Sequence, residues 1–396
     1  MNTVIITDKM LHGGIASGKI NGKRVFVNGA LPSEEISITI EQEKKDYSIA
    51  AIDKILTHSP YRRNAPCPLY GVCGGCNLMH ADDEYQKVLR ASILRDAFSR
   101  EGLAVNPVFK GGSPLSYRNR FQFESSGLKS AKSNTLITIP HCLVASDEVN
   151  AFLRNEKIPG KVKVFGSSSL VNTPKGYVFA ADEEETKQTV MHRGKKLKTG
   201  GKRKIYEGTS INKESEAVLS LNDTELSFDV RGFFQSNIEM LKETAGLIEK
   251  LIPNNAKILD MYGGAGTLSA LCARNASHVT LVEHNRDAVV FAEKNLRSIS
   301  HSSFGLSGIQ WIKTASDKNF DAVLIDPPRS GMEKEVCQWL CTSDIPLIIS
   351  LSCDPVTHAR DCAHLVQSGY EIETLYALDY YPQTSHVESL SVCIKK

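Results

Sequence analysis

Residues 257–269 read KILDMYGGAGTLS and combine a short apolar run, a glycine-rich turn and the start of a helix. The apolar run predicts a buried strand, because strands covered by helices on both faces are almost continuously hydrophobic. The glycines let the backbone turn tightly and approach a bound ligand. About twenty residues further on, HVTLVE at 278–283 predicts the next strand, and Glu283 at its end is placed to accept ribose hydroxyl groups. We therefore expect a doubly wound α/β sheet with a nucleotide-type site at its carboxyl edge.

Two further apolar runs end in polar residues. Residues 320–331 read FDAVLIDPPRSG and place Asp326 after a strand, whereas residues 345–355 read IPLIISLSCDP and place Cys353 there. Asp354 is a good helix cap, and a thiol at a helix N-terminus is favoured as thiolate by the helix dipole. A buried structural cysteine is the alternative, as is a simple capped turn at Asp326. The glycine turn, Glu283, Asp326 and Cys353 thus follow four successive predicted strands. This repetition favours a functional site over either alternative.

The pair of a thiol and a base indicates a particular chemistry. Carbon 5 of a pyrimidine is a poor nucleophile until a thiolate adds to carbon 6, and a base must later remove the carbon-5 proton. The segment PQTSHVE at 382–388 offers Glu388 as that base, with His386 as the rival because its ordinary pKa suits proton transfer. Cys353 and Glu388 are thus the candidate nucleophile and base.

A cysteine cluster lies in the first third of the chain. Residues 66–76 read PCPLYGVCGGC, which spaces Cys67, Cys73 and Cys76 as C-x5-C-x2-C, and Cys142 in IPHC at 139–142 is the best fourth ligand. Zinc accepts four thiolates and so does a [4Fe–4S] cluster, so the spacing predicts a metal centre without choosing between them.

Bulk composition limits the class of protein. The 396 residues suffice for two or three domains, and 41% hydrophobic with 23% charged residues is ordinary for a globular protein. The net charge of +2 gives no evidence for nucleic acid, but the basic segment 193–204 is either a solvated hairpin tip or an RNA-contacting loop. Without a membrane span or a signal peptide, we expect a cytoplasmic protein whose ten cysteines are free, metal-bound or catalytic.

The pattern of strands and turns divides the chain into three parts. Residues 1–57 predict a small β-barrel, residues 58–235 a β-rich central domain with the cysteine cluster, and residues 236–396 the α/β domain. In the central domain Arg118, Arg120, Phe121 and Phe123 mix cations with aromatic rings. Such a mixture holds RNA, or it marks a strand with one buried face.

Together these motifs resemble the bacterial S-adenosylmethionine (SAM)-dependent RNA uracil-5-methyltransferases. The resemblance covers nearly the whole chain and rests on FFQSN at 233–237, residues 259–269, DPPR at 326–329, SCDP at 352–355 and PQTSHVE at 382–388. It implies a class I, Rossmann-like methyltransferase domain preceded by a TRAM-like or OB-like barrel. Two positions depart from the family pattern: Asp354 stands where Asn is usual, and Thr267 where Asn is frequent.

The resemblance also assigns roles. It implies that Cys353 is the nucleophile, that Glu388 accepts the proton, and that Asp326 lies beside both uracil and methyl donor. SAM-contacting positions are implied for Gln235, Tyr262, Gly264, Thr267, Glu283 and Asp326. For the cysteine cluster the resemblance favours a [4Fe–4S] cluster over zinc, with Cys67, Cys73, Cys76 and Cys142 as ligands.

The expected substrate is a flipped-out uridine in RNA. The cysteine cluster and the barrel favour 23S rRNA over tRNA, by resemblance alone. A cytosine-5 methyltransferase and a non-catalytic RNA-binding protein are the alternatives, and a monomer is the expected oligomeric state.

Overall fold

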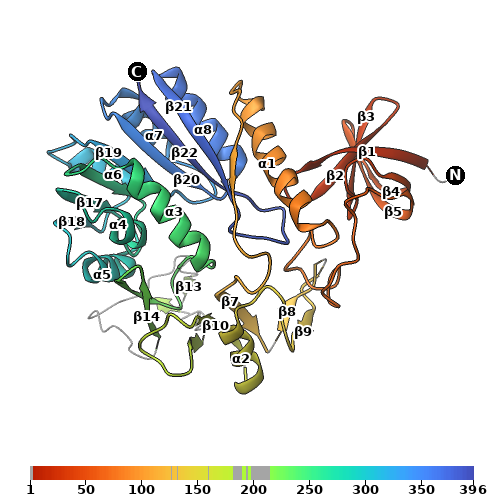
Figure 1. Ribbon diagram of the computed structural model, residues 1–396, viewed down its shortest axis with the longest axis horizontal. Helices are drawn as coiled ribbons and strands as arrows, with labels where there is room; N and C mark the ends of the chain where they lie inside the picture. The colour runs from red at the N-terminus through yellow and green to blue at the C-terminus, as the bar shows by residue number, and fades with distance from the viewer. Residues whose placement is uncertain are drawn as a thin grey trace.

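The computed structural model describes residues 3–125, 127–131, 133–158, 160–181, 190–192, 195–197 and 215–396. Figure 1 shows a barrel at the N-terminus, a β-rich part in the middle of the chain, and a large sheet with helices that contains the C-terminus. In the described part of the chain, no helix is long and apolar enough to cross a membrane.

The N-terminal part is a closed barrel with the strand order β1-β2-β3-β5-β4, so the small β-barrel is confirmed. Apolar side chains alternate along its strands and fill the interior, Ile5, Val25, Val27 and Ile36 among them. Its strands are β1 (Thr3–Leu11), β2 (Ile15–Ile20), β3 (Lys23–Asn28), β4 (Glu35–Glu43) and β5 (Tyr47–Thr57).

The middle of the chain contains a five-stranded sheet with the order β11-β10-β7-β8-β9. Helix α2 (Asp147–Asn155) packs on it through Phe152, which meets Phe123 at a ring separation of 6.3 Å. The strands are β7 (Arg120–Glu124), β8 (Gly127–Lys129), β9 (Leu136–Thr138), β10 (Lys161–Gly166) and β11 (Tyr177–Ala181). The basic segment 193–204 lies outside the described residues apart from the backbone of β13 (Lys195–Leu197), which pairs with β12 (Val190–His192).

The C-terminal part contains an eight-stranded sheet with the order β18-β17-β16-β19-β20-β22-β21-β6. The first five strands in this order, from β18 through β17, β16 and β19 to β20, are parallel to one another, whereas β22 runs antiparallel to both of its neighbours. The strands are β6 (Val108–Lys110), β16 (Lys257–Met261), β17 (His278–Val282), β18 (His301–Phe304), β19 (Ala322–Ile325), β20 (Leu347–Ser352), β21 (Tyr370–Leu378) and β22 (Glu388–Lys395).

Helices cover both faces of this sheet, so the doubly wound α/β fold is confirmed. Alternate residues of β16 point to opposite sides: Ile258 joins the core under α3 to α5, and Leu259 the core under α6 to α8. The hairpin β14 (Glu216–Leu221) and β15 (Thr224–Asp229) adds Leu219 to the first core. The helices are α3 (Ile238–Leu251), α4 (Thr267–Cys272), α5 (Arg286–Asn295), α6 (Gly308–Thr314), α7 (Lys334–Thr342) and α8 (Pro355–Gln367).

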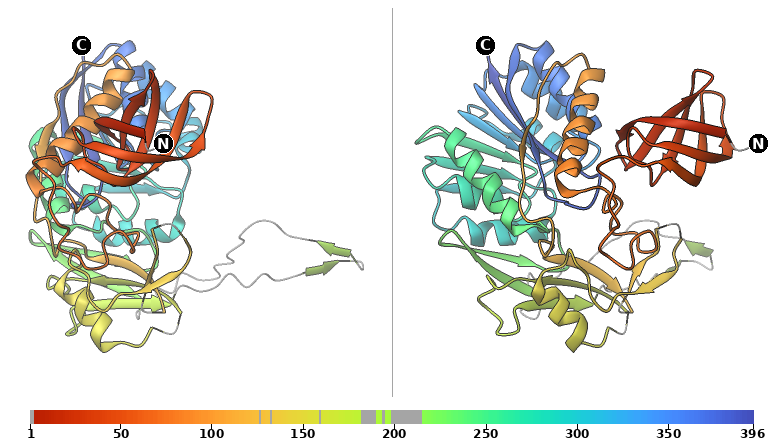
Figure 2. Two further views of the ribbon diagram at one scale, coloured as in Figure 1. Left: turned by 90° about the vertical axis from the view of Figure 1, so that its right-hand side faces the viewer. Right: turned by 45° about the vertical axis from the view of Figure 1, so that its right-hand side comes forward.

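Helix α1 (Asp83–Arg100) joins the barrel to this sheet. It packs against α8 and against the end of β1, and β6 pairs in parallel with β21. Figure 2 shows the barrel on the side of α1 that faces away from the sheet. Residues 83–110 therefore lie against the large sheet, although the expected boundaries put them in the central domain. The three-domain division remains a prediction.

Candidate active site

Three predicted site residues follow neighbouring strands at one edge of the large sheet. Met261 pairs with Val282 on one side and with Ile325 on the other. Tyr262, Glu283 and Asp326 are the next residues of these three strands. Because the strands are parallel, the three side chains gather at the carboxyl edge, where open α/β sheets bind their ligands.

The glycine turn and Glu283 are joined directly. The backbone N–H of Gly264, whose φ of +55° favours glycine, donates to Glu283 Oε2 at 3.1 Å. The N–H of Asn285 donates to Oε1 at 2.6 Å. Glu283 is buried, so the two bonds fix the carboxylate beside the turn. Its Oε1 also lies 3.0 Å from Nδ1 of His284, whereas Oε2 keeps a lone pair for a ligand.

A buried acid, Asp260, packs behind the glycine turn. Ser269 Oγ donates to Asp260 Oδ2 at 2.6 Å, and burial raises the pKa of Asp260 to about 6. Thr267 is the first residue of α4 and directly follows Gly266, which has a φ of +69°. Tyr262, with a φ of +63°, receives the N–H of Glu333 on its hydroxyl at 3.3 Å. The predicted SAM positions of this turn are thus adjacent in space.

Cys353 and Glu388 lie close together at the ends of two paired strands. Leu351 pairs with Leu390 and Ser352 with Ser389 in the antiparallel ladder of β20 and β22. Cys353 and Glu388 are the residues next to this last pair, and the charge of Glu388 acts on the Cys353 thiol. Glu388 is only 4% exposed. The nucleophile and base predicted from the sequence therefore occupy one place.

The electrostatics of this group differ from the expectation. Burial, Glu388 and Asp326 together raise the pKa of Cys353 to about 11, although the Arg329 guanidinium opposes them through its charge and a hydrogen bond. Burial and two acidic neighbours therefore act against the thiolate that is expected at the start of α8. Arg329, to which the sequence assigned no role, is the group that favours the thiolate.

Both acids hold their protons tightly. Burial raises the pKa of Glu388 well above its ordinary value, with Asp326 raising it further and Arg329 opposing. Burial and the nearby Asp260 raise the pKa of Asp326 to about 7. Two close carboxyl groups in a buried site disfavour double ionisation, so the protonated form of Glu388 is favoured more than in water.

Asp354 is a helix cap, as expected. Its Oδ1 accepts from the N–H groups of Val356 at 2.9 Å and Thr357 at 3.0 Å. Its Oδ2 lies 3.9 Å from Nε2 of His12, a residue of the barrel. Nothing in the sequence indicated this contact, because His12 stands alone in a turn at the other end of the chain.

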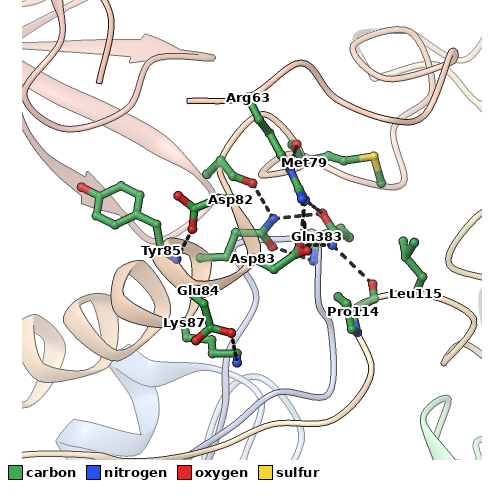
Figure 3. A network of polar contacts seen from close by, with 12 residues as sticks. Arg63, Met79, Asp82, Asp83, Glu84, Tyr85, Lys87, Pro114, Leu115 and Gln383 are labelled. Carbon is green, nitrogen blue, oxygen red and sulfur yellow. Dashed lines mark hydrogen bonds and ion pairs between the residues drawn. The ribbon is translucent and has the colours of Figure 1, made fainter. Parts of the chain in front are cut away.

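The segment that carries Glu388 is fixed by α1. Gln383, with a φ of +68°, donates through Nε2 to Asp83 Oδ1 at 2.8 Å, and its Oε1 accepts from Arg63 at 3.2 Å (Figure 3). Gln86 Nε2 donates to the same oxygen at 2.9 Å. Deeper in this contact, Arg90 Nη2 donates to Asp379 Oδ2 at 2.7 Å, and both side chains are buried. The segment 379–388 is thus a rigid part of the site.

His386 lies in this segment, next to Tyr381 at a ring separation of 6.0 Å. Burial lowers its pKa, and the positive Arg329, together with His12 and Arg118, lowers it further. An imidazole whose protonated form is disfavoured in this way is a weaker base. These surroundings favour Glu388 over its rival.

The segment before α3 reaches the same place from another side. Gln235 is 9% exposed, and the neighbouring Asn237 donates through Nδ2 to the carbonyl of Tyr380 at 3.3 Å. The hydrogen bond of Asn237 therefore connects the segment that contains Gln235 to the segment that carries Glu388.

The cation–aromatic mixture in β7 is resolved in favour of the alternative. Phe121 and Phe123 are buried and stack at 5.2 Å, so they belong to the core of the central sheet and are not free to stack on a base. The Arg118 guanidinium lies over the Phe121 ring at 4.9 Å, and Arg120 Nη2 donates to the Gly232 carbonyl at 2.6 Å.

The four predicted cluster cysteines gather in one region, and none forms a disulfide. Burial, followed by the nearby thiols of Cys142, Cys73 and Cys67, raises the pKa of Cys76 to about 12. Within the described residues, however, no group of three or more His, Cys, Asp or Glu side chains stands at a spacing that could hold a metal ion. The metal centre is therefore not confirmed.

The fold, and the polar residues gathered at the carboxyl edge of its sheet, are those of an α/β methyltransferase. The structure of a Pyrococcus abyssi tRNA (uracil-54, C5)-methyltransferase in complex with S-adenosyl-L-homocysteine matches with a TM-score of 0.72 over 98% of this chain and 99% of that one, at 20% identity. The family described as Conserved hypothetical protein 95 matches residues 237–346.

Sequence comparison places the chain more closely. It is 34% identical to an uncharacterized RNA methyltransferase of Treponema denticola, with 98% of each chain covered. It is 29% identical to an uncharacterized RNA methyltransferase of Thermotoga maritima over the same share of both chains. The chain belongs to this family of RNA methyltransferases.

Proposed function

We propose that this protein transfers the methyl group of SAM to carbon 5 of a uridine in RNA. The observation that carries the proposal is the proximity of Cys353, Glu388 and Asp326, whose charges act on one another at the ends of β20, β22 and β19. A thiol, a buried acid and a second carboxyl at one point match the needs of this chemistry. The similar Pyrococcus protein, which acts on a tRNA uracil at carbon 5, supports it.

In the proposed reaction Cys353 gives its proton to solvent and its sulfur adds to carbon 6, which gives an enolate that is nucleophilic at carbon 5. Carbon 5 takes the methyl group from the SAM sulfonium, and S-adenosylhomocysteine is released. Glu388 as carboxylate then removes the carbon-5 proton, the carbon 5–carbon 6 double bond reforms, and the thiolate leaves.

The perturbed pKa values fit a site that ionises only when loaded. A carboxylate with a raised pKa is a stronger base, and Arg329 favours the ionised forms of both Cys353 and Glu388. The proposed SAM positions are Gln235, Tyr262, Gly264, Thr267, Glu283 and Asp326. Among them, Glu283 would accept the ribose hydroxyl groups.

For the substrate we propose a uridine of 23S rRNA, with tRNA as the alternative. The similarity to the tRNA-acting Pyrococcus protein favours the alternative, and the cysteine cluster, through the family resemblance, favours rRNA. SAM-dependent methylation of unmodified transcripts of both, read by nucleoside mass spectrometry with mapping, decides between them. 5-Methyluridine in either RNA supports the reaction; 5-methylcytidine, or no methylated pyrimidine, would refute it.

We further propose that Cys67, Cys73, Cys76 and Cys142 hold a [4Fe–4S] cluster. The donor set fits in kind and number, since four free thiols lie in one half-buried region. Their present spacing does not, so cluster formation requires the 66–76 loop to rearrange. SAM methyl transfer is polar, so the proposed role is structural.

A further inference from the structure

The turn between β1 and β2 of the barrel reaches the catalytic residues. His12 Nε2 lies 3.9 Å from Asp354 Oδ2, directly after the nucleophile in sequence. The His12 ring is also 6.3 Å from the ring of His386 in the segment that carries Glu388. A residue of the N-terminal barrel therefore lies between the two segments that supply the nucleophile and the base.

Polar contacts hold the turn in this position. Asn77 donates through Nδ2 to the Gly13 carbonyl at 3.0 Å and to Ser385 Oγ at 3.1 Å. The Ser385 N–H donates back to Asn77 Oδ1 at 2.8 Å. Gly14 has a φ of +77°, and a Cβ there would stand 2.5 Å from Asn77 Nδ2, so the close approach depends on glycine.

Apolar packing continues the same contact. Met10 of β1 and Leu31 of the barrel share a buried core with Ala359 and Cys362 of α8 and with Leu94 of α1. The barrel is thus seated on the helix whose first turn carries Asp354. The position of the barrel therefore constrains the position of the first turn of α8.

The charge of Asp354 gives this contact a chemical role. A carboxylate one residue from Cys353 opposes formation of the thiolate unless it is compensated. Its Oδ1 is compensated by the two N–H groups at the start of α8. Its Oδ2 faces Nε2 of His12, whose other ring nitrogen, Nδ1, is buried without a hydrogen-bond partner among the described residues.

We propose that His12 is a positioning residue, the polar partner that compensates the charge of Asp354, so that docking of the barrel is a condition for efficient attack by Cys353. The proposal rests on the uridine methylation proposed above. It assigns the barrel a part in the chemistry, through Asp354, in addition to any contact with RNA.

A double-mutant cycle tests the coupling. The four proteins are wild type, His12→Ala, Asp354→Asn and the double variant, each assayed on the transcript that wild type methylates, with kcat and KM determined separately. Charge compensation predicts that His12→Ala lowers kcat about five-fold in the wild-type background and less than two-fold in the Asp354→Asn background. His12→Gln, which keeps a side-chain N–H donor, should retain most of kcat. His58→Ala, an exposed barrel residue, is the matched control and should not change kcat.

An equal loss of kcat in both backgrounds would overturn the proposal, because His12 would then act independently of Asp354. A loss confined to KM would overturn it too and would make His12 an RNA contact. Hydrogen exchange of the free protein separates these failures from failure of the methylation itself. His12→Ala should speed exchange in the 12–16 turn and at Val356 and Thr357, even if no uridine is methylated; unchanged exchange would refute the docking contact.

Discussion

Cys353 and Glu388 lie close together, each one residue beyond Ser352 and Ser389, the last pair of the ladder between β20 and β22. The register of an antiparallel pair decides which side chains share one face of the sheet, so a slip by one residue would turn Glu388 away from the thiol.

Replacing the nucleophile should abolish the reaction without emptying the donor site. In Cys353→Ala we expect no detectable 5-methyluridine, because no other group can add to carbon 6, and a SAM affinity within two-fold of wild type by calorimetry. Cys341→Ala, at a half-buried cysteine of α7, is the control. Methylation that survives in Cys353→Ala would refute the nucleophile.

Replacing the base should trap the intermediate. Glu388→Gln cannot remove the carbon-5 proton, so the thiol is not expelled and a covalent RNA–protein adduct should accumulate, visible as a slow band on a denaturing gel. Glu373→Gln, at an exposed acid of β21, should give no such band. Absence of the adduct in Glu388→Gln, with methylation intact, would move the base elsewhere.

The same substitution should change the pH dependence of stability. Because the folded protein raises the pKa of Glu388 above the ordinary 4.5, it binds this proton more tightly than the unfolded chain. The contribution of Glu388 to the free energy of unfolding is then fully present below pH 4.5 and falls as pH rises through the folded pKa. The Tm of Glu388→Gln minus the Tm of wild type should therefore be about 2–4 °C larger at pH 8 than at pH 5. An equal difference in Tm at both pH values would show that the pKa is not raised.

The buried ion pair behind the catalytic segment should be costly to break. Arg90→Met leaves Asp379 charged and buried, so we expect a loss of about 3–5 kcal/mol in the free energy of unfolding, measured in urea, together with reduced methylation. Arg95→Met, at an exposed position of the same helix, should cost less than about 0.5 kcal/mol. Similar losses for both variants would show that the pair does not hold the segment.

Metal content tests the cysteine cluster. Anaerobically purified wild type should be brown and contain iron and sulfide, and Cys73→Ser should lose both, because three thiolates hold a [4Fe–4S] cluster poorly. Cys341→Ser, outside the cluster region, should keep them. Stoichiometric zinc in wild type would replace the cluster with a structural zinc site.

Local patterns in the sequence were sufficient for the main elements. The apolar runs before Tyr262, Glu283, Asp326 and Cys353 are all strands, and the glycines at 264 and 266 do adopt the positive φ that such a turn requires. These features depend only on residues that are neighbours along the chain, so they can be predicted from the sequence. The alternation of buried and exposed positions also predicted the small barrel, which the structure closes from β1 to β5.

Patterns that have two meanings were not resolved by the sequence. Phe121 and Phe123 alternate with polar residues, which is equally typical of a base-stacking strand and of a strand with one buried face. Burial against Phe152 of α2, a distant helix, decided for the core. The thiolate expected at Cys353 is disfavoured for a similar reason, since Glu388 and Asp326 come from other strands.

The sequence by itself determined the class of fold, the edge of the sheet where the site lies, and the identity of the candidate nucleophile and base. Only the tertiary structure decided that burial and two acids raise the pKa of Cys353, that Arg329 opposes them, and that His12 of the barrel lies beside Asp354. Strand and turn preferences act between neighbours along the chain, whereas charge and burial act through space, between residues whose proximity exists only after folding.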